Sequence, residues 1–262
     1  MTIGIMAAMH DEIAGLVQHV SEQGSSTVRR VGLRDFYVGQ LQGQTCVIVL
    51  SGIGKVAAAS TAVSLIHQFG VTEIVFSGLA GGLADHVQVG DVVIADRLIQ
   101  HDMDARPLFP RYEIPLSGIA EFEVSSVLRT QLQQAARYFF EHELRECVLD
   151  ATRAQFGLRA PHIHVGMIAS GDQFIGAEHE LQRLRKELPC ALAVEMEGAA
   201  VAQICHEYAI PCSIIRTISD RADASAHVDF TRFLSEVASK YSSGIVRAYI
   251  TARSRSDAGN SI

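Results

Sequence analysis

The sequence predicts a single-domain α/β protein, a three-layer sandwich with a central mixed, mostly parallel sheet flanked by helices. Short apolar runs alternate with longer segments whose apolar residues recur at helical spacing. No Pro/Ser/Gly-rich linker separates two halves of different composition. The 262 residues are 48% hydrophobic and 19% charged, which suffices for one large core. We therefore expect one domain over residues 1–252 and a frayed tail over 253–262.

The first part of the chain predicts one strand, one helix and a set of hairpins. The apolar run 3–6 favours a strand, and apolar residues then recur at helical spacing over 11–20. Glycines break 28–49 into two or three short runs, a pattern typical of antiparallel hairpins, with 46–50 as the buried strand. Two glycines then turn the chain into a helix over 55–69. We expect an α/β unit that hairpins extend.

The rest of the chain repeats the alternation of strand and helix. The expected strands are 73–77, 92–99, 164–169, 192–194 and 212–218, with a glycine turn over 78–82 after the first of them. The expected helices are 124–142, 181–188, 196–208 and 230–250. Because strands that alternate with helices usually pair in parallel, we expect helices on both faces of the sheet.

Charge and apolar patterning exclude several classes of protein. A net charge of −7 is unsuited to a phosphate backbone, so we expect no nucleic-acid partner. No apolar run reaches the roughly 18 residues of a membrane helix, and the first residues carry no basic leader, so we expect no membrane partner and a cytoplasmic location. The five cysteines form no C-x-x-C pair and are expected to be buried, reduced thiols.

Two short motifs are too weak to predict a cofactor or a metal. Gly52-x-Gly54-x-x-Ala57 resembles part of a dinucleotide or phosphate loop, but Val56 stands where Ser or Thr would hold magnesium. A tight strand-to-helix turn is the simpler interpretation, with a ligand near the helix N-terminus left open. His101-Asp102-Met103-Asp104 has metal-binding side chains but no second group at a recognisable spacing. We expect neither cofactor nor metal.

Acidic residues follow two apolar runs near the C-terminus. Glu195 and Glu197 flank Met196 where a strand becomes a helix, so at most one of them points into a cleft, and we favour Glu197. Asp220 follows Ser219 at the end of an apolar strand, where it serves either as a helix cap or in proton transfer. Because open α/β sheets place their chemistry beyond the carboxyl ends of strands, these carboxylates predict an enzyme that acts on a small molecule.

A set of glycine-rich and acidic segments spans nearly the whole chain. The segments are Ile3 to Met9 with Glu12, Ser51 to Ala59, Gly78 to Leu83, Val89 to Asp91, Ser170 to Ile175, Ala193 to Ala200 and Ile214 to Asp220. In this order they resemble the nucleoside phosphorylase superfamily, in particular its nucleosidases for 5′-methylthioadenosine and S-adenosylhomocysteine. The resemblance implies a hydrolase that releases adenine from these nucleosides in methionine salvage, without a cofactor.

The resemblance also implies which residues react. Asp220, positioned by Ser219, would donate a proton to N7 of adenine, and Glu12 would be the general base toward a water on the other face of the ribose. N-glycosidic cleavage passes through an oxocarbenium-like state, which calls for one acid and one base on opposite sides. An aspartic acid that donates near neutral pH must have a raised pKa, and we predict this for Asp220.

Further residues are implied to bind the substrate. Glu197 would accept hydrogen bonds from the 2′- and 3′-hydroxyls, and Met196 would pack on the sugar. Phe174 would stack on the purine, while the backbone of Ile175 would read its edge. Gly81 would let the backbone approach the base and the sugar closely.

Hydrolysis is favoured over phosphorolysis. Related phosphorylases carry an arginine-containing loop after the first strand, where this chain has Ala8 to Glu12. A carboxylate there would repel phosphate, which needs converging cationic donors. Arg216 would then bind the water or the sugar, or be a remnant phosphate contact. A phosphate-dependent phosphorylase is the alternative enzyme, and a nucleoside sensor without turnover is disfavoured because it needs no acid and base pair.

Two departures from the family pattern leave the substrate range open. Leu79 stands where related nucleosidases often have Ser or Thr, and the segment 131–162 is longer than expected, as a surface excursion or an altered lid. A related adenosyl substrate such as aminofutalosine stays an alternative. Family members are commonly dimers, so we expect a homodimer in which Phe109 or Tyr112 of a neighbour's loop, 107–112, closes the pocket.

Overall fold

Strands and helices alternate along the part of the chain that the computed structural model describes, residues 1–22, 26–158, 160–221 and 230–259. The strands are β1 (Thr2–Ala7), β2 (Thr27–Val31), β3 (Arg34–Leu41), β4 (Gln44–Leu50), β5 (Glu73–Gly82), β6 (Val92–Gln100), β7 (Glu121–Glu123), β8 (Ile163–Ser170), β9 (Ala191–Glu195) and β10 (Cys212–Asp220). The helices are α1 (His10–Glu22), α2 (Lys55–Phe69), α3 (Ser126–Tyr138), α4 (Leu144–Cys147), α5 (Asp150–Gln155), α6 (Glu178–Glu187), α7 (Gly198–Glu207), α8 (Phe230–Phe233) and α9 (Ser239–Gly259). Two π-helical stretches, Phe139–Glu143 and Leu234–Ala238, follow α3 and α8.

The sheet is mixed and mostly parallel, as predicted. The strands β4, β1, β5 and β10 run parallel to one another, and so do β6, β8 and β9. The two groups meet in antiparallel pairings between β10 and β6 and between β5 and β9, so that β5, β10, β6, β8 and β9 close into a ring. The hairpin β2–β3–β4 extends the sheet beyond β1. The carboxyl ends of β1, β5, β8, β9 and β10 all reach one region, where the candidate site lies.

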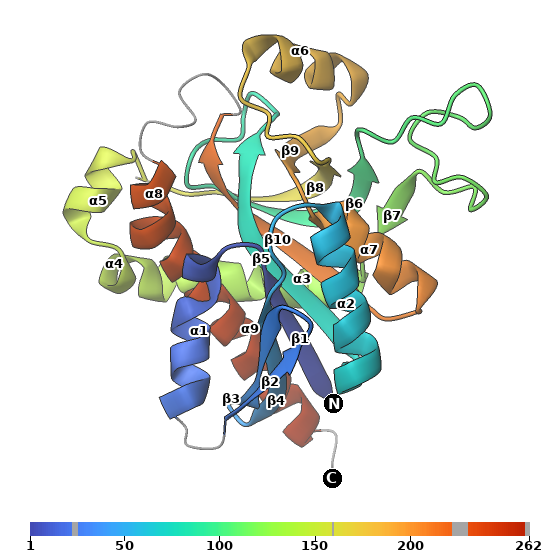
Figure 1. Cartoon of the computed structure of the whole chain (residues 1–262). Coiled ribbons are helices and arrows are strands. Elements are labelled where there is room, and N and C mark those ends of the chain that lie inside the picture. Colours follow the sequence, from blue (N-terminus) through green and yellow to red (C-terminus); the bar gives the residue numbers. More distant parts are fainter. Residues whose placement is uncertain (23–25, 159, 222–229, 260–262) are drawn as a thin grey trace.

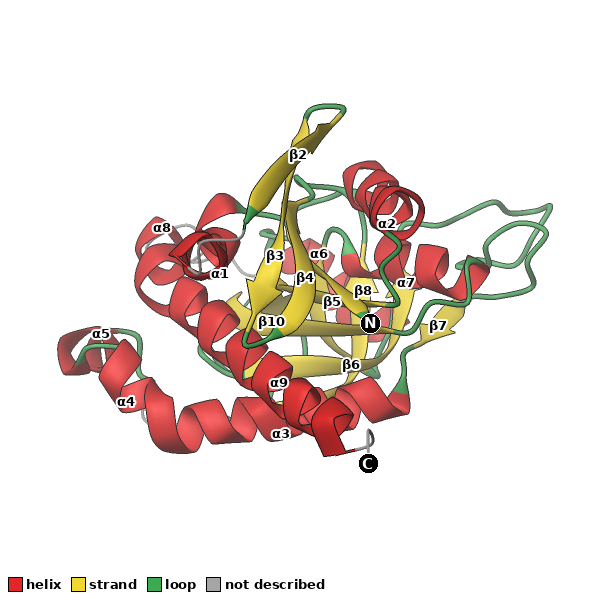
Figure 2. Cartoon of the chain, turned by 90° about the horizontal axis from the view of Figure 1, so that it is seen from below, coloured by secondary structure: helices red, strands yellow, loops and turns green. Residues whose placement is uncertain are grey.

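Helices cover both faces of the sheet, which confirms the three-layer sandwich. In Figures 1 and 2, α1, α3 and α9 lie against one face, and α2 and α7 lie against the other. The first face buries a cluster that includes Phe139, Tyr241 and Tyr249. The second buries Phe36, Phe76 and Phe122. Because both faces are covered, the inner strands β5 and β10 are buried along nearly their whole length rather than at every second residue.

The expected glycine turn over 78–82 is wrong, because this segment is the last part of β5. Gly81 pairs with β9 on one side and with Asp220 of β10 on the other. Glycine serves close approach here: a Cβ atom at Gly78 would lie 3.2 Å from Oε1 of Glu12. Because these glycines have no side chain, neighbouring elements can approach the end of β5 closely.

The long helices differ from expectation near their ends. The helix expected over 124–142 turns π-helical after Tyr138, and the closing helix is likewise interrupted before α9. The tail expected to be frayed over 253–262 is helical up to Gly259, and Arg253 pairs with Glu73 at 2.8 Å. Residues 260–262 lie outside the described residues. The proposed domain boundary at residue 252 is thus not marked by the end of a helix.

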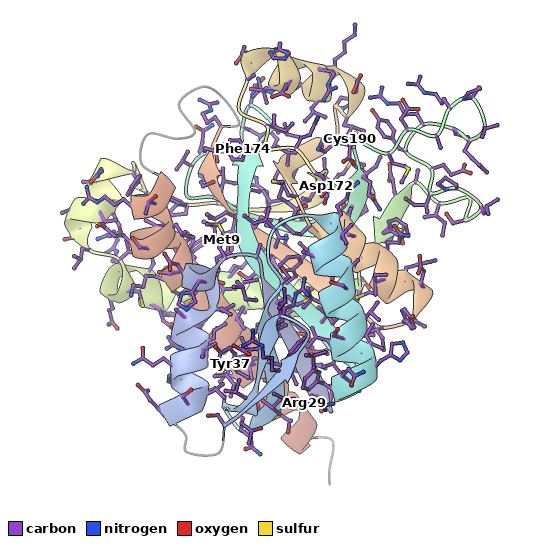
Figure 3. The ribbon with its side chains drawn as sticks, in the orientation of Figure 1. Met9, Arg29, Tyr37, Asp172, Phe174 and Cys190 are labelled. Atoms are coloured by element: carbon purple, nitrogen blue, oxygen red, sulfur yellow. The ribbon has the colours of Figure 1, made fainter. Side chains whose placement is uncertain are left out.

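The cysteines and the helices bear on two further expectations. All five thiols are free, but Cys190 is exposed in the turn before β9 and Cys147 is only partly buried, so the expectation of five buried thiols is wrong for both (Figure 3). Among the residues that the structure describes, no helix is long and apolar enough to cross a membrane.

Candidate active site

A cavity of about 280 Å³ opens where several parallel strands end. Every catalytic and substrate-binding residue that the resemblance implies lines it, whereas Phe109 and Tyr112 do not. The lining residues are Ala8, Met9, Glu12, Ile53, Gly78, Leu79, Ala80, Gly81, Gln173, Phe174, Ile175, Val194, Glu195, Met196, Glu197, Arg216, Ser219 and Asp220. They come from six separate segments of the chain, so the fold assembles the cavity from residues that are remote in sequence.

Glu12 lies in the first turn of α1 and is 2% exposed. Its Oε2 accepts hydrogen bonds from the amides of Ala8 and Met9 at 3.0 and 2.8 Å, and its Oε1 accepts one from the amide of Leu79 at 3.1 Å. Burial raises the pKa of Glu12 to about 7, although these amides and the charge of Arg216 act in the opposite direction. A carboxyl group with this pKa can take up a proton near neutral pH.

Glu195 and Arg216 form a buried ion pair beneath the cavity. The Nη2 and Nε atoms of Arg216 lie 2.7 and 3.1 Å from Oε2 of Glu195. Nη1 donates to the carbonyl oxygens of Phe76 and Ile215, and the guanidinium stacks 4.2 Å from the centre of the Phe76 ring. Arg216 is 1% exposed. Its donors are thus directed at protein groups rather than toward a phosphate.

Ser170 and the start of α7 also donate hydrogen bonds to the Glu195 carboxylate. Ser170 donates its hydroxyl hydrogen bond to Oε1 of Glu195, and the amides of Glu197 and Gly198 also donate to this carboxylate. The Ser170 hydroxyl in turn accepts from the amide of Ala199 at 2.7 Å. Glu195 therefore caps α7 and neutralises Arg216. The sequence analysis missed this role of Ser170, for which its place at the end of a strand was the available signal.

Glu197 occupies the N-cap position of α7 and turns the other way, toward α2. Its Oε1 accepts a hydrogen bond from the amide of Gly54 at 2.8 Å. Among the described residues, no group binds its Oε2, which is available to a ligand in the cavity. Burial, followed by the nearby charge of Glu195, raises the pKa of Glu197. The sequence-based choice of Glu197 over Glu195 for the cleft thus agrees with this geometry.

Asp220 ends β10 on the opposite wall of the cavity and is 8% exposed. Ser219 donates from its hydroxyl to Oδ2 of Asp220 at 2.7 Å. The strand bulges between Ile218 and Asp220, where Asp220 pairs with Gly81 of β5. The bulge re-aims the side chains at the strand end, a use that bulges often have beside active sites.

The loop after β8 forms an apolar side of the cavity. Phe174 is 49% exposed, whereas Ile175 is buried in a small cluster with α6. In Figure 3 Phe174 lies near the tip of β5, and Met9 lies near the start of α1 below it. Met196 also lines the cavity, between the two glutamates of the β9–α7 junction. A flat ring and an apolar sugar face therefore have apolar partners here.

The start of α2 is a tight turn whose amides donate hydrogen bonds to carboxylates. Gly52 and Gly54 have φ angles of 78° and 96°, a region that favours glycine. The amide of Lys55 donates to Oδ1 of Asp172 at 2.8 Å. The Nζ atom of Lys55 lies 2.6 Å from Oδ1 of Asp102. The interpretation as a strand-to-helix turn is confirmed. Asp102, considered above as a metal ligand, instead joins this turn to the Phe174 loop, since it also accepts from the amide of Asp172 at 2.9 Å.

The structure also locates two other predicted features, Leu79 and the segment 131–162. The side chain of Leu79 lines it and packs against the α1 and α9 side of the core. No described residue of the segment 131–162 lines it, and this segment packs on α9 through the ion pair of Glu143 with Arg247. That location favours the surface excursion over the lid.

The loop 101–120 extends away from the sheet (Figure 1). Tyr112 is tied to its own chain, because its hydroxyl lies 3.4 Å from Glu187 of α6 and Arg111 pairs with the same carboxylate. Tyr112 is therefore held against α6 of its own chain.

Comparison with known proteins finds relatives that match along nearly the whole chain. The 5′-methylthioadenosine/S-adenosylhomocysteine nucleosidase of Shewanella denitrificans is 35% identical over 251 residues, which cover 96% of this chain and 99% of the relative. The structure of the nucleosidase of that name from Neisseria meningitidis, in complex with methylthio-immucillin-A, superposes with a TM-score of 0.82 at 31% identity and covers 96% of this chain and 99% of its own. A futalosine hydrolase mutant of Helicobacter pylori gives a TM-score of 0.81 at 30% identity, with coverage of 96% and 99%.

The phosphorylase superfamily model matches residues 2–251. This range contains the ring of strands, both helical layers and every residue that lines the cavity. With this match and relatives above 30% identity along nearly their whole length, the chain belongs to the phosphorylase superfamily.

Proposed function

We propose that this protein is a purine nucleosidase that hydrolyses the N-glycosidic bond of 5′-methylthioadenosine and S-adenosylhomocysteine, releasing adenine and the thioribose product. The observation that carries the proposal is the placement of Glu12, at the start of α1, and Asp220, at the end of β10, in the lining of one cavity that Glu197 also lines. The names of relatives at 35% identity support the same substrates.

Asp220 is the general acid and Glu12 the general base. Protonation of adenine N7 by Asp220 lets the base leave as a neutral molecule, while the ribose gains oxocarbenium character. Glu12, whose pKa is about 7, takes a proton from the attacking water. Ser219 orients the Asp220 carboxyl group through its 2.7 Å hydrogen bond.

The other cavity residues bind the nucleoside. Glu197 accepts from the ribose 2′- and 3′-hydroxyls through the oxygen that Gly54 does not bind. Met196 packs on the sugar, Phe174 stacks on the purine, and the backbone of Ile175 reads the purine edge. Gly81 has no side chain to obstruct the base, so the substrate can lie close to the end of β5.

Water rather than phosphate is the nucleophile. Arg216 is the one cation among the described residues that line the cavity, and its donors are directed at Glu195 and backbone carbonyl oxygens. The first amides of α2, which would otherwise attract an anion, bind Glu197 and Asp172. A phosphate dianion would thus meet the Glu12 carboxylate without a compensating charge. Arg216 acts indirectly, as the partner that holds Glu195 and faces Glu12.

A second adenosyl substrate is supported by one comparison. The futalosine hydrolase of Helicobacter pylori matches as well in fold as the methylthioadenosine nucleosidase. Apolar Met9 and Ile53 at the mouth of the cavity suit an alkylthio group. Because one methylene changes binding in an apolar pocket by only ~1–3 kcal/mol, aminofutalosine remains the substrate to compare.

The family also supports proposals for the oligomeric state, the cellular location and the pathway. We propose a homodimer in which a neighbour's Phe109, or less readily Tyr112, closes the open side of the cavity. Ile53, Val56 and Leu108 are 61%, 81% and 83% exposed, an apolar surface near the cavity mouth and on the extended loop that a partner would cover. Sedimentation of wild type and Phe109→Asp tests this. We further propose a cytoplasmic enzyme of methionine salvage, which uses no metal or cofactor.

The deciding experiment follows adenine release from 5′-methylthioadenosine, S-adenosylhomocysteine and aminofutalosine, with and without phosphate. We expect release without phosphate and a loss of ~100- to 10,000-fold in kcat for Asp220→Asn. Asp11→Asn, a change beside Glu12 on the exposed side of α1, is the control and should keep full activity. Release that requires phosphate and yields ribose 1-phosphate products would show a phosphorylase instead.

A further inference from the structure

The end of β10 that carries Asp220 is held by a turn that does not line the cavity. β10 pairs with β6 as far as Thr217, opposite Val92. Beyond this pair, the amide of Ile218 donates to the carbonyl oxygen of Asp91 at 2.9 Å, and the amide of Gly90 donates to the carbonyl oxygen of Ile218 at 2.8 Å. These backbone bonds lie two residues before Asp220. The turn 88–91 therefore fixes the position of Ile218, from which the last two residues of β10 continue.

The Asp91 carboxylate fixes the shape of this turn. Asp91 is 2% exposed. Its Oδ2 accepts from the amide of Gln88 at 2.9 Å and lies 2.8 Å from Nε2 of His164, while its Oδ1 accepts from the amide of His162 at 2.8 Å. The carboxylate thus closes the turn through Gln88 and links the turn to the start of β8. A buried carboxylate with three donors has little freedom to move.

On its opposite side, β10 is held by β5. There the pairing shifts at the bulge, so that Ile218 lies opposite Ala80 and Asp220 lies opposite Gly81. The Ser219 hydroxyl lies 2.7 Å from Oδ2 of Asp220, and the carbonyl oxygen of Ala80 is 3.4 Å from it. A bulge leaves one residue, here Ser219, without its ladder bonds and bends the strand beside it. The turn on the β6 side adds a restraint on β10 two residues before the acid.

We propose that Asp91 is a positioning residue for the acid step, because it holds the turn that places Asp220 against the leaving group. This inference rests on the proposed function, in which Asp220 is the acid. A displacement of about 1 Å at a reacting group lowers a rate by up to ~100-fold, so the loss of one bond to Asp91 is enough to be measured in kcat.

The test must separate positioning from general support of the fold. If Asp91 acts through Asp220, its substitution lowers kcat and leaves KM nearly unchanged, because Asp220 serves the transition state. The loss of kcat should also disappear when Asp220 is already replaced, since the effects of substitutions at coupled residues are not additive. General loosening of the domain would raise KM and add fully to any other substitution.

The experiment is a double-mutant cycle with 5′-methylthioadenosine as substrate. Asp91→Asn keeps the size of the side chain but turns an NH2 group toward one of its donors. We expect kcat to fall ~10- to 100-fold in this variant and less than ~3-fold further when it is added to Asp220→Asn. Glu73→Gln, another buried carboxylate at the far end of β5, is the matched control, with a lower Tm but unchanged kcat.

A milder variant covers the case in which Asp91→Asn does not fold. His164→Leu removes one donor to Asp91 and leaves the two amide bonds, and His164→Gln restores a donor. We expect a several-fold loss of kcat in the first and recovery in the second. Full additivity with Asp220→Asn, or a rise of KM alone, overturns the role of Asp91. Unchanged kcat in Asp220→Asn by itself overturns the proposed function instead.

Discussion

The two walls of the cavity hold their carboxylates in different ways. On the α1 wall, Glu12 bonds amides three and four residues away, with Leu79 as the one distant donor. On the β10 wall, Asp220 has its neighbour Ser219, a bulge against Gly81 and the turn 88–91, which lies well over a hundred residues away in the sequence. The difference teaches that the base is placed by local structure and the acid by tertiary contacts.

The two walls also differ in what lies behind them. Behind Glu12 is the buried ion pair of Arg216 and Glu195, whose positive partner lowers the pKa of Glu12 against the larger effect of burial. Behind Asp220 are backbone hydrogen bonds and the Asp91 carboxylate. Changes on the α1 wall should therefore act through charge, and changes on the β10 wall through geometry.

The largest expected effect on the α1 wall is the loss of the base. Glu12→Gln should lower kcat by ~100- to 10,000-fold, because an amide cannot accept the proton. Only the ionised Glu12 acts, so wild-type activity should rise with pH through about 7, the pKa of Glu12, and this rise should be absent in the variant. The pH profile of kcat/KM, which reports the groups of the free enzyme, is the measurement. An acidic limb that persists in Glu12→Gln would assign it to another group, such as Glu197.

The next largest effect is on stability. Arg216→Met leaves Glu195 buried without its cation, which should cost about 3–5 kcal/mol in the free energy of unfolding. Urea denaturation at neutral pH measures this loss. Arg216→Met combined with Glu195→Gln should recover part of it, because the uncompensated charge is gone. If the double variant is no more stable than the single one, lost packing rather than charge is the cause.

A smaller effect is the dependence of stability on pH. The pKa of Glu12 is about 7 in the folded protein, against 4.5 ordinarily. Its contribution is therefore complete below pH 4.5 and is lost as the pH rises through 7, because the unfolded chain ionises first. The loss amounts to roughly 3 kcal/mol. Denaturation of wild type and Glu12→Gln at several pH values should show a weaker decline in the variant. Glu197 contributes with the same sign, so some decline remains.

The smallest expected effect tests geometry on the β10 wall. Ser219→Ala removes the hydroxyl that holds Oδ2 of Asp220, and a hydrogen bond of this kind is worth about 1 kcal/mol, or roughly a 5-fold change in kcat. KM should stay the same. Ser117→Ala, which removes a loop hydroxyl far from the cavity, is the control. A loss as large as that of Asp220→Asn would mean that Ser219 contributes more than orientation.

Much of the fold was predictable, because its signals are short-range. The helix 55–69 agrees with α2 residue for residue, and the buried runs at 92–99 and 164–169 lie within β6 and β8. The glycine segment 78–82 was not predictable as a strand, since glycines favour turns unless other elements pack against them. Only the pairing with β9 and β10 makes them extended.

The sequence by itself determined the alternation of strand and helix, the place of Glu12 in the first turn of a helix, and the carboxylates at the ends of apolar strands. These follow from periodicity and from bonds that span a few residues. The tertiary structure alone decided that Glu195 pairs with Arg216, and that the turn at Asp91 bonds the strand of Asp220. Those outcomes depend on burial and on partners remote in the chain, whose distances are set only when the sheet closes.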